Sequence, residues 1–132
     1  MRRFVRVTLI VAFALVVPIA SVFASTATLY GHLNHDGSLT QFPTWRYHDH
    51  LGTVSAYIDN LPNGGGQLRL GLRATSGVQF TNTQVWTAFG SQEFTLASNG
   101  SNQIPVQNFA INGRMDPCGI FCDDDFGGTL AY

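Results

Sequence analysis

Polar and apolar residues alternate along three segments of the chain. In residues 26–34, Leu29 and Leu33 fall on one side, and tyrosine and histidine residues fall on the other. The same two-residue period runs through residues 53–59 and 67–73. This period places one set of side chains on a core and the other in water, as a half-buried antiparallel strand requires. The pattern therefore predicts a β-strand over each segment.

Shorter apolar segments are further candidates for strands. They cover residues 77–81, 84–89, 92–97, 104–107, 108–114 and 128–132. Turn-forming pairs such as Asp36-Gly37 and Asn99-Gly100 separate the segments. No segment after residue 24 carries a sustained apolar stripe of helical period. Short strands joined by Gly and Asn turns predict an all-β fold, an antiparallel two-sheet β-sandwich that is either jelly-roll-like or Greek-key.

The inward side of these strands supplies the predicted core. A sheet exposed on both faces buries too little apolar surface, so two sheets must pack face to face. The predicted core residues are Leu29, Leu33, Val54, Ile58, Leu68, Leu70, Leu72, Phe80, Phe94, Leu96, Phe109, Ile111 and Leu130.

The first 24 residues have the composition of a secretory signal peptide. Three arginines in the first six residues precede an apolar run from Val7 to Ala20, and Val22 and Ala24 stand three and one positions before a cut after Ala24. The alternative is a retained membrane anchor. However, a spanning helix needs about 20 apolar residues, and Pro18 would interrupt it. The sequence thus predicts a signal peptide over 1–24 and one secreted domain over 25–132, with no membrane attachment after cleavage.

The charge of residues 25–132 narrows the classes of partner. Arg46, Arg69, Arg73 and Arg114 stand against eight acidic residues, which gives a net charge of −4. Nucleic-acid-binding surfaces usually cluster basic residues. The sparse, acidic charge excludes nucleic acid as an expected partner.

Cys118 and Cys122 have three residues between them, in a loop that begins at Asp116-Pro117. In an exported protein, an even number of nearby cysteines predicts a disulfide. A redox-active pair is the alternative, but thioredoxin-type sites place two residues between the cysteines at a helix N-terminus. We therefore expect a structural disulfide.

Four histidines form one candidate metal site. His32, His35, His48 and His50 lie close together in the sequence, near Asp36 and Asp49. Imidazole nitrogens with a carboxylate suit Zn²⁺ or Cu²⁺. Alternatively, these histidines are ordinary residues of polar faces and turns, because their spacing matches no zinc signature.

A run of acidic residues forms a second candidate metal site. Asp123, Asp124 and Asp125 follow the cysteines, and Asp116 precedes them. Loop carboxylates suit Ca²⁺, which makes calcium a possible cofactor. However, the run lacks the alternating ligands and terminal glutamate of an EF-hand loop, and a solvated turn is the alternative.

Aromatic residues form a third candidate site. Trp45, Tyr47, Tyr57 and Trp86 exceed what the core requires, and Tyr57 lies on the polar side of its predicted strand. Exposed rings on a sandwich face, with nearby amide side chains, bind sugars by stacking and hydrogen bonding. The alternative is that the two tryptophans cap the ends of the core.

Together these features favour a secreted, non-catalytic binding module for a carbohydrate or another cell-surface ligand. No nucleophile elbow, zinc-protease helix or phosphate loop is present in the sequence, and Glu93 is its only glutamate. We therefore do not expect an enzyme. Two alternatives remain open: a structural or interaction protein of the cell exterior that pairs with another extracellular protein through an edge strand, and a metal-binding secreted protein.

Overall fold

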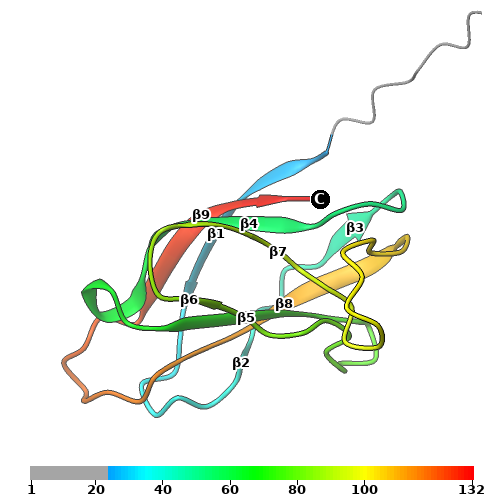
Figure 1. Cartoon of the computed structure of the whole chain (residues 1–132). Coiled ribbons are helices and arrows are strands. Elements are labelled where there is room, and N and C mark those ends of the chain that lie inside the picture. Colours follow the sequence, from blue (N-terminus) through cyan, green and yellow to red (C-terminus); the bar gives the residue numbers. More distant parts are fainter. Residues whose placement is uncertain (1–23) are drawn as a thin grey trace, which may run out of the picture.

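The computed structural model describes residues 24–132, so nearly all of the predicted signal peptide lies outside the described residues. In this part of the chain, nine strands form two antiparallel sheets (Figure 1). The strands are β1 (Thr26–His32), β2 (Thr40–Gln41), β3 (Arg46–His48), β4 (Ser55–Asn60), β5 (Leu68–Arg73), β6 (Gln84–Trp86), β7 (Gly90–Glu93), β8 (Gln107–Met115) and β9 (Asp125–Ala131). A single 3₁₀ turn, η1 (Pro62–Gly64), follows β4. Within residues 24–132, no helix is long and apolar enough to cross a membrane.

The strand order is that of a jelly roll. One sheet has the order β1-β9-β4-β7, and the other has β2-β8-β5-β6 with β3 also paired to β8. Counting β2 and β3 as one interrupted strand, the first strand pairs with the last, the second with the next to last, and so on inward to the pair β5 and β6. The chain therefore runs as one long, folded-over hairpin, which resolves the two predicted alternatives in favour of the jelly roll.

The three alternating segments are strands, as predicted. They form β1, β4 and β5, and residues 108–114 are part of the longer strand β8. The last strand begins earlier than predicted, because β9 starts at Asp125 rather than at residue 128. A clear two-residue period was thus sufficient to find these strands.

The shorter segments were predicted less well. Only the first half of segment 84–89 forms a strand, β6, and β7 begins at Gly90, two residues before the predicted segment 92–97. The other two segments, 77–81 and 104–107, contain isolated bridges instead of the predicted strands. The sequence also gave no indication of β2 and β3, because strands of two and three residues are too short to show a period.

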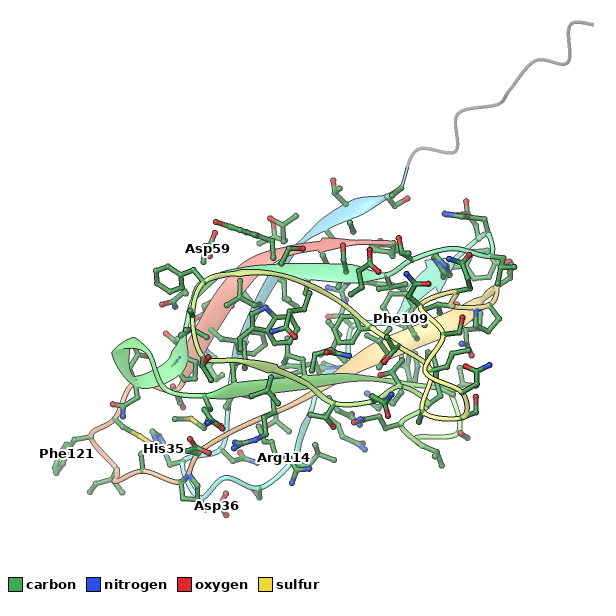
Figure 2. All side chains as sticks on the ribbon, in the orientation of Figure 1. His35, Asp36, Asp59, Phe109, Arg114 and Phe121 are labelled. Carbon is green, nitrogen blue, oxygen red and sulfur yellow. A yellow bond between two sulfur atoms is a disulfide. The ribbon has the colours of Figure 1, made fainter. Side chains whose placement is uncertain are left out.

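Inward side chains of both sheets form the core. All predicted core residues are buried except Phe80 and Leu96, which are partly buried and pack against it. Phe109 lies between the two layers in Figure 2. The core also takes Ala56, Leu61, Trp86, Ile104, Met115 and Phe126.

The two outer faces carry different charges. Arg69, Arg73 and Arg114 alternate with the inward residues of β5 and β8, so they lie on the outer face of the five-stranded sheet. Asp59 of β4 lies at the opposite, four-stranded layer (Figure 2). The molecule therefore presents one arginine-containing face and one face without arginine.

The loop before β9 closes one end of the sandwich. It contains the Cys118–Cys122 disulfide, as predicted. The backbone N–H of Cys118 donates to the carbonyl oxygen of His35 at 2.8 Å, and that of Leu33 donates to Asp124 at 3.0 Å. His35, Asp36 and Phe121 lie together at this end in Figure 2. The turn after β1 and the loop before β9 are thus tied to each other.

Candidate functional site

Trp86 is not part of an exposed aromatic surface, contrary to the prediction. It is 1% exposed, and its indole N–H donates to the carbonyl oxygen of Gly90 at 3.0 Å. Trp86 lies opposite Leu68 of β5, and both side chains point into the core. The alternative that this tryptophan belongs to the core is therefore correct.

Trp45 and Tyr47 lie together on the outer face of the five-stranded sheet. Tyr47 is opposite Asn108, the neighbour of the inward Phe109, so the tyrosine ring points outward. Trp45 stands two residues earlier on the same extended segment and therefore on the same side. Trp45 is 43% exposed and Tyr47 57% exposed. These two rings form the aromatic pair of this face.

Arg73 holds the indole of Trp45 in place. Its guanidinium carbon lies 4.6 Å from the centroid of the Trp45 ring. Arg73 is itself buried, and its Nη2 donates to the carbonyl oxygen of Phe42 at 2.7 Å. A cation–π contact of this kind stabilises by roughly 1 kcal/mol. The indole is thus held in one orientation, which would lower the entropy cost of binding a ligand against it.

Amide side chains border the aromatic pair. Asn108 lies directly across from Tyr47, and Gln41 of β2 lies opposite Asn112 of β8 on the same face. Asn108 and Gln41 are exposed, so their amide groups are free to bind a ligand. The face therefore combines flat apolar rings with neutral donors and acceptors.

Tyr57 lies on the opposite sheet. It points outward from β4, opposite Thr129 of β9, and is 50% exposed. The predicted set of four aromatic residues is thus divided into a pair, an isolated tyrosine and a core residue. Sequence reasoning also missed Tyr30, an exposed residue on the outer face of β1 whose alternation with Leu29 was the available signal.

The four histidines divide into two groups at different places. His48 and His50 lie side by side, with ring centroids 4.8 Å apart. His48 is fully buried, which corrects the interpretation of all four as residues of polar faces and turns. His50 Nδ1 and Asp49 Oδ1 are 2.7 Å apart, and this hydrogen bond lowers the pKa of Asp49. Neither of these two histidines joins the acidic run.

His32 and His35 contact the acidic run near the end of β1. Asp124 lies between them: its Oδ1 is 3.6 Å from His32 Nδ1, and its Oδ2 is 3.4 Å from His35 Nε2. Asp125 also pairs with His32, because the two residues are in register between β1 and β9. Half of each predicted metal site thus comes together in one cluster, which we call the His/Asp cluster (His32, His35, Asp124, Asp125).

The other acidic candidates have different partners. Asp116 forms an ion pair with Arg69 at 2.6 Å, and Asp123 Oδ1 accepts a hydrogen bond from the backbone N–H of Asp125. Asp36 accepts one from the N–H of Ser38, and the hydrogen bonds from Ser38 lower the pKa of Asp36. The contacts of Asp36 and Asp123 are those of ordinary turns, and Asp116 is engaged by Arg69 of β5, so neither Asp116 nor Asp123 belongs to the cluster.

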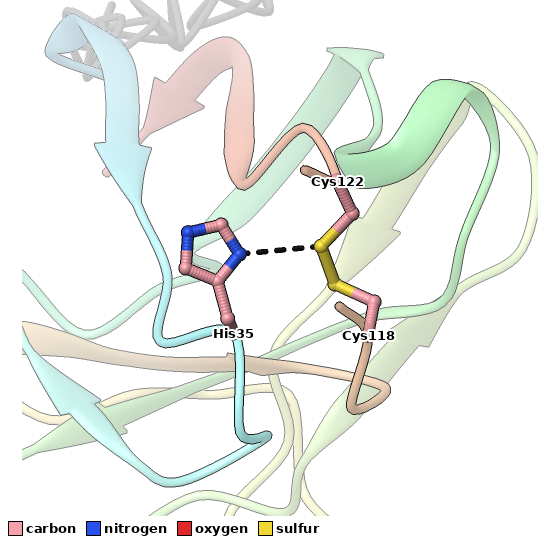
Figure 3. A group of neighbouring side chains, drawn as sticks. All are labelled: His35, Cys118 and Cys122. Carbon is pink, nitrogen blue, oxygen red and sulfur yellow. Dashed lines mark hydrogen bonds between the residues drawn. A yellow bond between two sulfur atoms is a disulfide. The ribbon is translucent and has the colours of Figure 1, made fainter. Parts of the chain in front are cut away.

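The disulfide packs against the same cluster. His35 Nδ1 lies 3.2 Å from Cys122 Sγ (Figure 3). This contact turns the other ring nitrogen, Nε2, toward Asp124. A shallow hollow of about 570 Å³ opens beside these residues, lined by His32, Leu33, Asn34, His35, Asp36, Ser38 and Asp124.

A comparison of the chain with known protein families, with curated proteins and with solved structures found no match.

Proposed function

We propose that the protein is a secreted, non-catalytic binding module that recognises a carbohydrate through the outer face of its five-stranded sheet. The single observation that carries this proposal is the exposed pair Trp45 and Tyr47, side by side on one face with the indole held by Arg73. Predicted export would bring this face into contact with glycans of the cell exterior.

Sugar rings fit this surface for a chemical reason. Each ring has an apolar C–H face that stacks on an aromatic side chain, and hydroxyl groups at its edge that need hydrogen-bond partners. Tyr47 supplies a stacking surface and Asn108 a neutral amide beside it, and Gln41 supplies a second amide farther along the same face, beyond Trp45. Arg73 is engaged by the carbonyl oxygen of Phe42, and the residue directly across from Tyr47 is the neutral Asn108, although Arg114 lies farther along the same face.

The non-catalytic part of the proposal follows from the positions of the carboxylates. Glu93 lies on the exposed strand β7 and accepts a hydrogen bond from Asn102 at 2.7 Å. A glycosidase places two carboxylates across one cleft. Asp49, which hydrogen-bonds to His50, is the carboxylate that stands nearest to Tyr47 in the sequence, whereas Glu93 belongs to the other sheet, and this separation supports binding without catalysis.

The test is retention on insoluble polysaccharides and cell-wall fractions, followed by measurement of the affinity for the ligand that is found. Tyr47→Ala is expected to weaken binding at least about tenfold, which corresponds to about 1.4 kcal/mol. Tyr57→Ala is the matched control, because it removes a similarly exposed tyrosine from the opposite sheet. The proposal is wrong if no polysaccharide is retained, or if Tyr57→Ala weakens binding while Tyr47→Ala does not.

A further inference from the structure

The His/Asp cluster assembles metal-ligating groups from two distant parts of the chain. His32 ends β1, and Asp125 begins β9, and the pairing of these two strands places the residues opposite each other. Ligand atoms of His32, Asp124 and Asp125 all lie within 4.8 Å of one another. One imidazole and two carboxylates can thus contact a single point.

One separation in the cluster, that between His32 and Asp124, is longer than a direct hydrogen bond, whereas Asp125 contacts His32 directly. Two atoms that each lie about 2.0–2.1 Å from a tetrahedral zinc ion are about 3.3 Å from each other. His32 Nδ1 and Asp124 Oδ1 are 3.6 Å apart. A direct N–H···O hydrogen bond is roughly 2.7–3.2 Å long. The spacing of this pair is therefore close to that of two ligands around a metal.

The charge around the cluster favours a cation. Asp36, Asp123, Asp124 and Asp125 lie at this end of the molecule. Among residues 24–132, the one ion pair of an arginine is that of Arg69 with Asp116, so no arginine pairs with these four aspartates. Carboxylates that lie this close together repel one another. A divalent ion would reduce this repulsion, and the hollow beside His32 and Asp124 gives it access from solvent.

Neighbouring side chains hold the ligands in a suitable orientation. Tyr30 Oη lies 3.2 Å from His32 Nε2, so the Nε2–H can donate to the phenol and leave the lone pair of Nδ1 for a metal. His35 is in the same way a positioning residue, because its Nε2 faces the second oxygen of Asp124.

We propose that His32, Asp124 and Asp125 bind a divalent transition-metal ion, with Zn²⁺ as the best chemical match. Imidazole is a good ligand for zinc, whereas calcium takes oxygen ligands almost throughout. Three protein ligands leave one tetrahedral position open for water or a ligand atom. This inference does not depend on carbohydrate binding, because His32 lies on the four-stranded sheet and Tyr47 on the other.

The experiment is calorimetric titration of the tag-free protein with ZnCl₂ and, separately, with CaCl₂. We expect one zinc ion per chain, a higher melting temperature at saturating zinc, and no response to calcium. His32→Gln and Asp125→Asn are each expected to weaken zinc binding at least about tenfold. The side chain of His32 is 65% exposed, so its replacement does not disturb the core.

His50→Gln is the matched control, since it removes a histidine that pairs with Asp49 away from the cluster. It is expected to bind zinc as the unmodified protein does. Histidine ¹⁵N spectra give a second readout, in which zinc shifts the ring signals of His32 and leaves those of His48 and His50 unchanged. Absence of zinc binding at millimolar concentration, calcium binding in its place, or loss of binding in His50→Gln but not in His32→Gln would each overturn the proposal.

Discussion

Whether a side chain of this protein is buried or exposed depends on which side of its strand it occupies and on which residues lie against it. Val85 and Trp86 are neighbours on β6, yet Val85 is exposed and Trp86 is buried opposite Leu68. The size of a tryptophan favours burial, and its position on the strand permits it. Tyr47, by contrast, has Asn108 rather than a core residue opposite it. The local register thus separates a buried ring from an exposed ring.

At Gly128, the neighbouring strands determine which residue type fits, because they leave no room for a side chain. This glycine lies on β9, between β1 and β4, opposite Leu29 on one side and Ile58 on the other. A Cβ atom at this position would overlap the backbone carbonyl of Tyr57, which cannot rotate away. Close approach of the two strands therefore depends on glycine here.

We predict that Gly128→Ala destabilises the domain by about 1–3 kcal/mol or more, because the added methyl group forces β4 and β9 apart. Urea unfolding followed by circular dichroism measures this change. Gly119→Ala is the control, since no atom lies within 4 Å of a Cβ at that position. Equal stability of the two variants would show that the strands have room to separate.

At the level of the element, the sequence predicted strands where the period was long enough to read. The sequence predicted the four strands whose runs of polar and apolar residues are at least five residues long, β1, β4, β5 and β8. β2 and β3 were not predicted, although β3 carries Tyr47 and follows directly after Trp45. Their conformation is determined by pairing with β8, a strand far along the chain, and no local pattern records that pairing.

The candidate sites follow the same rule. The sequence identified the histidines, the acidic run and the exposed rings as separate groups. It could not show that His32 meets Asp125, because this contact depends on the register of β1 against β9. It also could not show that Arg73 supports Trp45, since that contact joins β5 to the segment before β3. Residue types were predictable, and their grouping was not.

The disulfide loop is an element whose contribution is local. Its ring of residues from Cys118 to Cys122 is small, so the chain-entropy account gives only about 2 kcal/mol. Replacing both cysteines by serine is expected to lower the free energy of unfolding by about this amount or less. Hydrogen exchange is expected to rise in the amide of Cys118, which donates to His35, while amides of β8 remain protected. Global unfolding of the double variant at room temperature would contradict this.

At the scale of the whole molecule, the nested pairing makes the two ends of the described chain meet. β1 and β9 are adjacent, and the backbone groups of Ser25 and Tyr132 exchange hydrogen bonds of 2.8 Å and 2.6 Å. β9 is nevertheless an inner strand, with β4 on its other side. Because such pairings span most of the sequence, we expect the fold to form slowly relative to helical proteins of similar size.

The last three residues therefore stabilise the fold far more than their number suggests. Deleting residues 130–132 removes Leu130 from the core, the contact of Tyr132 with Phe109 at 5.5 Å, and pairing to both β1 and β4. Burial of Leu130 alone contributes about 1.5–3 kcal/mol. A small domain has only about 5–15 kcal/mol in total, so we expect a large fall in the urea midpoint or loss of folding. The matched control replaces Ile120 and Phe121 by alanine, because these side chains are 80% and 97% exposed and their truncation removes apolar atoms without removing core contacts. If the deletion and the control unfold at the same urea concentration, β9 does not join β1 to β4, and the jelly-roll pairing derived for this chain is wrong.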